Sequence, residues 1–150
     1  MTDYNRLVEA LRLQLPELDI REGEPMARHT TFRVGGKVRV FVRPTTVEEI
    51  VSICNLLKAE GIRPFLMGRG SNLLVADEYL DGVGIQLAEN FSDCRREGET
   101  ALYAQAGVTL VRLARLAQEY GLTGMEFAGG IPGALGGGVS MNAVADGGEL

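Results

Sequence analysis

Glycine is concentrated in two parts of this chain, and its distribution limits how the backbone can run there. The 150 residues include 20 Gly, which gather near 61–84 and 121–148. Because glycine has no Cβ, clusters of it are typical of backbone that turns sharply or approaches another group closely. The sequence therefore predicts two segments in which main chain, rather than side chains, forms a contact surface.

The first of these segments contains the loop Gly68-Arg69-Gly70-Ser71-Asn72, directly after a predicted strand. Two Gly allow successive backbone N–H groups to point inward together, an arrangement that suits a pyrophosphate. Ser71 and Asn72 add side-chain donors, and Arg69 adds positive charge. A plain tight turn would explain the same residues, since a short Gly-x-Gly pattern is a weak signal by itself.

The second segment runs from Gly129 to Ala143 and is apolar and rich in small residues. Pro132 can begin a short helix at its first position, and the small residues after it would let a flat ring or a phosphate lie against main chain. A disordered linker is the alternative, but linkers are rich in Ser, Pro and charge. Phe127–Ala145 is uncharged, yet its six Gly make it poor material for a membrane-spanning helix.

Hydrophobic periodicity predicts a mixed α and β chain. Apolar residues recur at helical spacing in three places, which predicts helices over 4–11, 47–57 and 110–117. Thr46 with Glu49 has capping-box spacing, Gly61 is expected directly after the second helix, and Thr109 is expected to cap the third. Cys54 falls on the apolar face expected for the second helix, and we expect it in the core. Residues 17–25 are polar and are predicted to be irregular. Strand patterns are expected at 38–43, 63–67, 73–75, 83–87 and 101–105.

Charge and composition exclude several function classes. The net charge of −5 argues against a general nucleic-acid binder. Residues 28–43 hold five basic residues and no acid, which indicates either a solvated strand face or a binding surface for an anion. Asp77, Glu78 and Asp81 match no calcium loop and are interpreted as a solvated turn. The two Cys have no zinc spacing, and His29, the only His, has no evident partner, so the chemistry is expected to come from a cofactor.

Four segments carry motifs of a known family: Arg28–Gly36, Gly68–Val75, Gly121–Phe127 and Gly130–Ala143. In order and spacing, across nearly the whole chain, they resemble the UDP-N-acetylenolpyruvoylglucosamine reductases, also called UDP-N-acetylmuramate dehydrogenases. The combination is far more specific than any single motif. The resemblance implies an α+β FAD-binding domain of the vanillyl-alcohol-oxidase and p-cresol-methylhydroxylase type.

The resemblance also implies an organisation and a cofactor site. Two subdomains are expected, over 1–88 with the N-terminal helix and over 89–150, the second incomplete and the substrate domain absent. The first loop would hold the FAD pyrophosphate, and the second segment would run along the flavin and its phosphates. The implied cofactor-binding residues are Gly68, Arg69, Gly70, Ser71, Asn72, Leu73, Gly130, Ile131, Pro132, Gly133, Gly136, Gly137, Asn142 and Ala143.

In such enzymes NADPH gives a hydride to FAD, and the reduced flavin passes it to the enolpyruvyl group of a UDP-sugar. The product, UDP-N-acetylmuramate, serves peptidoglycan synthesis in the cytoplasm, and the acidic start of the chain has no signal-peptide pattern. The family's catalytic Arg, Ser and Glu are expected beyond Leu150. No catalytic residue and no metal ligand are therefore assigned, and the 150 residues alone are expected to be inactive.

Two other interpretations stay open. The chain departs from the family pattern at Val144, where Gly is usual, at Asp146, where an aromatic residue is common, and at Gly138, where Ala is more usual. Val144 and Asp146 favour a non-catalytic remnant or interaction module that keeps the fold and binds no flavin. Another FAD-linked oxidase of the same fold is the second alternative. A yellow purified protein would favour flavin binding over the remnant.

Overall fold

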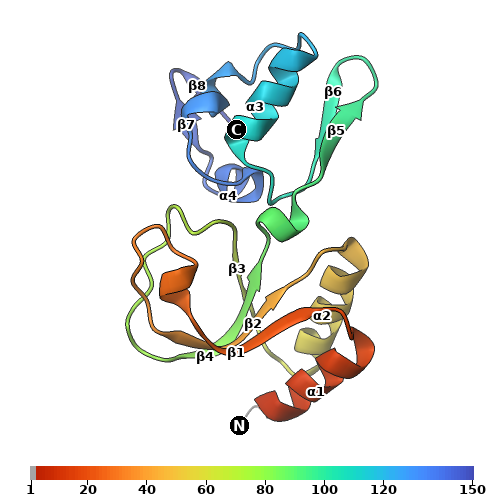
Figure 1. The fold of residues 1–150 in the computed structure, drawn as a ribbon, viewed down its shortest axis with the longest axis vertical. Coiled ribbons are helices and arrows are strands. Elements are labelled where there is room, and N and C mark those ends of the chain that lie inside the picture. Colours follow the sequence, from red (N-terminus) through yellow and green to blue (C-terminus); the bar gives the residue numbers. More distant parts are fainter. Residues whose placement is uncertain (1–2) are drawn as a thin grey trace. The chain divides into compact units, whose positions relative to one another are not determined.

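The computed structural model describes residues 3–150 and divides the chain into two units, Met1–Gln86 and Leu87–Leu150. Both units combine helices with strands (Figure 1). The first contains α1, β1, η1, β2, α2, β3 and β4, and the second contains η2, β5, β6, α3, η3, α4, β7 and β8. The expected mixture of α and β structure is confirmed.

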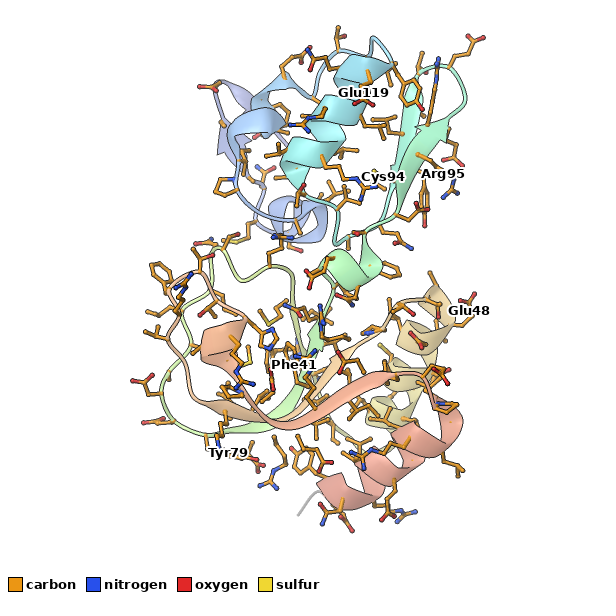
Figure 2. The ribbon with its side chains drawn as sticks, in the orientation of Figure 1. Phe41, Glu48, Tyr79, Cys94, Arg95 and Glu119 are labelled. Atoms are coloured by element: carbon orange, nitrogen blue, oxygen red, sulfur yellow. The ribbon has the colours of Figure 1, made fainter. Side chains whose placement is uncertain are left out.

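A four-stranded sheet forms the centre of the first unit, in the order β1-β2-β4-β3. Strand β2 (Lys37–Arg43) pairs antiparallel with β1 (Asp19–Pro25) and parallel with β4 (Leu80–Gln86), while β3 (Phe65–Met67) lies parallel on the far side of β4. The expected alternation of β2 is present, yet Val40 and Phe41 from its opposite faces are both buried. Strand β2 is therefore an interior strand covered on both sides, and Phe41 lies inside this unit (Figure 2).

Two helices complete the first unit. Helix α1 (Tyr4–Gln14) buries Leu7, Val8 and Leu11, as its spacing predicts, and contacts α2 and β2. Helix α2 (Val47–Ala59) begins with a capping box between Thr46 and Glu49. It ends before Gly61, whose φ of +67° suits the left-handed position that follows a helix.

The buried face of α2 differs from the prediction. Ile53 and Leu57 are its buried residues, whereas Val47 and Val51 are about half exposed. Cys54 is exposed, so the prediction that it belongs to the core is wrong. The apolar residues of this helix cover more than one face, and the position of the sheet, rather than periodicity, decides which of them become buried.

Two other predictions for the first unit are also wrong. Residues 17–25, expected to be irregular, include strand β1, whose polar side chains gave no alternating apolar signal. Residues 73–75, expected as a strand, form an irregular segment in which Leu74 is exposed. The short helix η1 (Met26–Arg28) joins β1 to the segment that leads into β2.

The second unit is built around helix α3 (Leu110–Glu119), which is capped by Thr109 and buries Leu110, Leu113 and Ala117. Its other elements are η2 (Glu89–Phe91), the antiparallel pair β5 (Cys94–Glu97) and β6 (Ala101–Ala104), η3 (Glu126–Gly130), α4 (Leu135–Ser140), and the pair β7 (Val144–Ala145) and β8 (Gly148–Glu149). Pro132 does not begin a helix, because α4 starts three residues later with Ala134 as its N-cap. No helix within residues 3–150 is long and apolar enough to cross a membrane.

Candidate functional site

The first glycine loop follows strand β3, at the carboxyl end of a parallel strand, where ligands commonly bind in open α/β sheets. Gly70 is buried and has a φ of +66°, a left-handed conformation that favours glycine. A Cβ at Gly70 would collide with the carbonyl oxygen of His29. The Gly70 carbonyl also accepts a hydrogen bond from the N–H of Thr31 at 3.0 Å. Glycine at position 70 is thus required by the segment that packs against the loop.

The same loop is held at its beginning by a side chain from strand β4. The Gln86 amide nitrogen donates to the carbonyl of Gly68 at 3.2 Å, and the Gln86 amide oxygen accepts from the Arg43 Nε at 2.9 Å. Leu73, which follows the loop, packs against the core cluster of the first unit around Phe41. The loop is therefore anchored at three points by its own unit.

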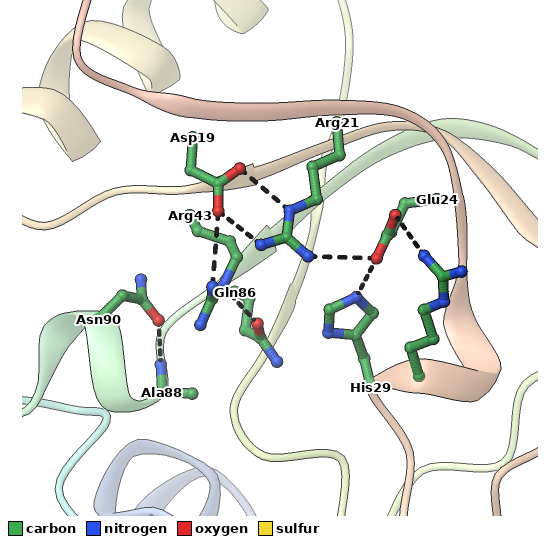
Figure 3. A network of polar contacts seen from close by, with 9 residues as sticks. Asp19, Arg21, Glu24, His29, Arg43, Gln86, Ala88 and Asn90 are labelled. Atoms are coloured by element: carbon green, nitrogen blue, oxygen red, sulfur yellow. Dashed lines mark hydrogen bonds and ion pairs between the residues drawn. The ribbon is translucent and has the colours of Figure 1, made fainter.

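A network of charged side chains lies in the first unit (Figure 3). Arg21 forms two hydrogen bonds with Asp19, at 3.0 and 2.8 Å, and contacts Glu24 at 3.3 Å. The His29 Nε2 lies 2.8 Å from a Glu24 oxygen, so the only histidine has a partner that the sequence did not reveal. The His29 ring also packs against Phe41, with ring centroids 4.5 Å apart.

This network lowers the pKa of both carboxyl groups in it. For Asp19, the hydrogen bond from Arg21 is the main cause of the lowered pKa. For Glu24, burial is the largest single effect and raises the pKa, but the hydrogen bonds from His29 and Arg21 and the charges of the same two residues together outweigh it and lower the pKa. Glu24 is therefore a buried carboxylate whose negative charge is matched by its neighbours.

The basic run over 28–43 is mostly neutralised by acids from outside it. Arg28 lies 3.9 Å from Glu24, Arg43 lies 3.5 Å from Asp19, and Arg39 pairs with Asp81. Asp81, interpreted as part of a solvated turn, is exposed and holds Arg39. Arg33 and Lys37 are exposed and form no ion pair with the described residues. The run is thus mainly a set of structural ion pairs.

The second glycine segment contains two kinds of glycine. A Cβ at Gly136 would lie 2.8 Å from the Ala106 Cβ, and one at Gly138 would lie 2.7 Å from a methyl group of Leu150. In contrast, a Cβ at Gly130 or Gly137 would meet no atom within 4 Å. Gly136 is therefore needed for packing within the second unit, and Gly138 is buried against leucine methyl groups at the flexible ends of their side chains, whereas Gly130 and Gly137 expose main chain at a surface.

The other predicted residues of this segment have distinct roles. Gly133 has a φ of +139°, and its carbonyl accepts the Leu110 N–H at 3.2 Å. Asn142 has a φ of +47°, and its side-chain amide donates to Glu149 at 3.2 Å. Ala143 donates its N–H to Gly138 at 2.9 Å. Ile131 is half-buried and Pro132 is exposed.

One of the two departures in the last residues, Asp146, has a structural explanation. Val144 pairs with Glu149 in the β7–β8 hairpin, and Asp146-Gly147 forms its two-residue turn. Both turn residues have positive φ, +48° and +80°. A turn of this kind favours Asp-Gly, so Asp146 fits its position and does not by itself indicate a decayed site.

The predicted residues thus fall into two local groups, Gly68–Leu73 in the first unit and Gly130–Ala143 in the second. Glu24 and Gln86 were missed by sequence reasoning, although both touch the segments that hold the first loop. Within the described residues, no group of three or more His, Cys, Asp or Glu side chains could hold a metal ion. The arrangement offers main-chain surfaces and donors, which suit binding of an anionic cofactor.

The FAD binding domain family matches residues 38–150. UDP-N-acetylenolpyruvoylglucosamine reductase of Clostridioides difficile is 44% identical over 136 residues, covering 91% of this chain and 44% of the relative. The Bacillus subtilis reductase is 42% identical over 127 residues, which cover 85% of this chain and 42% of that relative. The chain therefore spans less than half the length of these curated relatives.

Solved structures agree with the sequence relatives. The UDP-N-acetylenolpyruvylglucosamine reductase from Thermus caldophilus has a TM-score of 0.67 and 32% identity, over 89% of this chain and 45% of that one. A solvent-stable cholesterol oxidase has a TM-score of 0.61 at 19% identity, over 85% of this chain and 25% of that one. At this identity the likeness concerns the fold alone. The expected FAD-binding fold is confirmed. The chain belongs to the FAD-binding domain family and is similar to the FAD-binding part of UDP-N-acetylenolpyruvoylglucosamine reductases.

Proposed function

We propose that this chain binds FAD through its two glycine segments. The single observation that supports this most is the pair of open glycine surfaces at Gly130 and Gly137, in the same segment as Gly136, whose lack of a Cβ is explained by packing against Ala106. Glycine in a helix is destabilising relative to alanine by roughly 0.5–1 kcal/mol. An exposed helical glycine with free space around it therefore favours a ligand that must approach the main chain.

The residues of the first loop fit the pyrophosphate of the cofactor. Backbone N–H groups of Gly68–Asn72 would surround the pyrophosphate, and the side chains of Ser71 and Asn72 would donate to its oxygens. The Gly130–Ala143 segment would lie along the flavin and its phosphates. Leu73 and Gly136 would act indirectly, because their neighbours belong to the protein itself, and Gly70 would also be needed for the loop to pack against the His29 carbonyl.

We further propose that, in a protein of the relatives' length, this domain serves an NADPH-dependent reduction of UDP-N-acetylglucosamine enolpyruvate to UDP-N-acetylmuramate. FAD, when bound, supplies the hydride-transfer chemistry, and the protein supplies binding and orientation. The described residues would hold the cofactor and exclude water from its phosphates. No catalytic acid or substrate ligand is proposed among them. A cytoplasmic location follows from this proposal, since NADPH and nucleotide sugars are made there.

A titration of the flavin-free chain with FAD tests the proposal. We expect stoichiometric binding, read from quenching of flavin fluorescence and from the visible spectrum of the bound flavin. A folded chain that leaves FAD unbound would refute it and favour the non-binding alternative. A version extended to the relatives' length should also oxidise NADPH only when the UDP-sugar is present, and sugar-independent oxidation would favour another FAD-linked enzyme.

A further inference from the structure

The orientation of two peptide groups in the first glycine loop is set by residues outside the loop. The Gly68 carbonyl accepts from the Gln86 amide, and the Gly70 carbonyl accepts from the Thr31 N–H. No peptide bond among the described residues is cis. In a planar trans peptide, C=O and N–H point in opposite directions. Fixing these two carbonyls therefore also fixes the N–H groups of Arg69 and Ser71, which point away from Gln86 and Thr31 respectively.

Gln86 is suited to this task because its amide can bond in only one orientation. Gln86 is 5% exposed, and the Arg43 guanidinium, which has no acceptor, donates to its oxygen at 2.9 Å. The amide nitrogen must then face the Gly68 carbonyl. Reversing the amide would place its N–H groups against the guanidinium and its oxygen against the carbonyl.

Arg43 is held in turn by the charged network on β1. Its guanidinium lies 3.5 Å from Asp19, which Arg21 binds through two hydrogen bonds. The Arg43 side chain is only 17% exposed, so it has little freedom to leave Gln86. Figure 3 shows the contacts Asp19–Arg43–Gln86. The bond from Gln86 to the Gly68 carbonyl continues this chain of contacts from one edge of the sheet to the first glycine loop.

We propose that Gln86 is a positioning residue for the cofactor: by holding the Gly68 carbonyl, it directs the Arg69 N–H toward the bound pyrophosphate. This inference rests on the proposed binding of FAD. Gln86 itself touches neither phosphate nor flavin in this account. Its contribution is preorganisation, since a loop that already presents its N–H groups loses less entropy on binding.

Two substitutions test this role. Gln86→Glu keeps the oxygen that accepts from Arg43 but replaces the donor with a second oxygen, which would repel the Gly68 carbonyl. Gln86→Met keeps the volume and removes both polar groups. Gln14→Glu, an exposed residue of the same unit with the same charge change, is the matched control. We expect both Gln86 variants to raise the Kd for FAD at neutral pH by about tenfold or more, and Gln14→Glu to change it less than twofold.

A second measurement needs no FAD and separates positioning from general loss of structure. Residual dipolar couplings of the flavin-free chain give the direction of each N–H within the first unit. In Gln86→Glu we expect the Arg69 N–H to reorient while the Ser71 N–H, held through Thr31, keeps its direction.

Each result has a defined meaning. FAD binding equal to that of the parent in both Gln86 variants would overturn the inference and leave the proposed function intact. An unchanged direction of the Arg69 N–H in Gln86→Glu would overturn the inference even if FAD binding falls. Unfolding of both variants would also overturn it, because Gln86 would then be needed for folding and not for positioning the loop. A parent chain that binds no FAD would instead refute the proposed function, and the dipolar couplings would still decide whether Gln86 directs the loop.

Discussion

Replacing Gly137 with Ala should make the flavin-free chain more stable and its FAD binding weaker. Gly137 lies inside helix α4, is exposed, and has room for a Cβ with no atom within 4 Å. Alanine at such a position should stabilise the fold by about 0.4–1 kcal/mol. If the flavin lies against this main chain, the added methyl group must displace it. Overpacking of a close contact costs about 1–3 kcal/mol, which is about 5- to 150-fold in Kd.

The assay combines urea unfolding of the flavin-free chain with FAD titration, and two other glycines serve as controls. Gly82→Ala also enters open space, but in strand β4, and should leave FAD affinity unchanged. Gly136→Ala should destabilise the chain without any ligand, because its Cβ would lie 2.8 Å from that of Ala106. If Gly137→Ala binds FAD as tightly as the parent, the open glycine surface is not a flavin surface and this reasoning fails.

Three further predictions follow from the same structure. Alanine at Ser71 or Asn72 should weaken FAD by roughly 1.5–3 kcal/mol, and unchanged titrations for both would mean that main-chain donors alone hold the phosphates. Thr46→Ala removes the capping box of α2 and should lower the free energy of unfolding by about 0.5–2 kcal/mol in urea, with no effect on FAD. Asp19 and Glu24 have lowered pKa values in the folded chain, so their stabilisation is present above their unfolded pKa values and is lost as pH falls through the folded ones. Urea unfolding at a series of pH values should show this loss below about pH 4, and Glu24→Gln should flatten that part of the profile.

Local signals predicted the helices of this chain well. The spacing of Leu7, Val8 and Leu11, and the caps at Thr46 and Thr109, depend on residues within one or two turns of each other. Such features are written in short stretches of sequence. The Gly61 position after α2 was predictable for the same reason.

Features that depend on tertiary partners could not be predicted. Strand β1 is polar because Asp19, Arg21 and Glu24 are satisfied by one another and by residues farther along the chain. Gln86 bonds to residues 43 and 18 positions away, and nothing near it in sequence indicates either bond. The exposure of Cys54 likewise depends on which face of α2 meets its unit.

The candidate site shows the same division. The two glycine segments were found from composition and spacing, and the resemblance assigned them to one cofactor. Only the three-dimensional structure separates Gly137, with free space, from Gly136, which packs against Ala106. Only the structure shows that the His29 carbonyl leaves no room for a Cβ at Gly70. For this reason a Gly70 variant would confound folding with binding, whereas Gly137→Ala does not.

Hydrogen exchange of the 150-residue chain, with and without FAD, tests whether the two glycine segments bind the cofactor. We predict that FAD protects amides in two separate segments, Gly68–Leu73 and Gly130–Ala143, while exchange in helix α2 stays unchanged. Binding that protects neither segment, or a folded chain whose exchange is unaffected by FAD, would contradict the account.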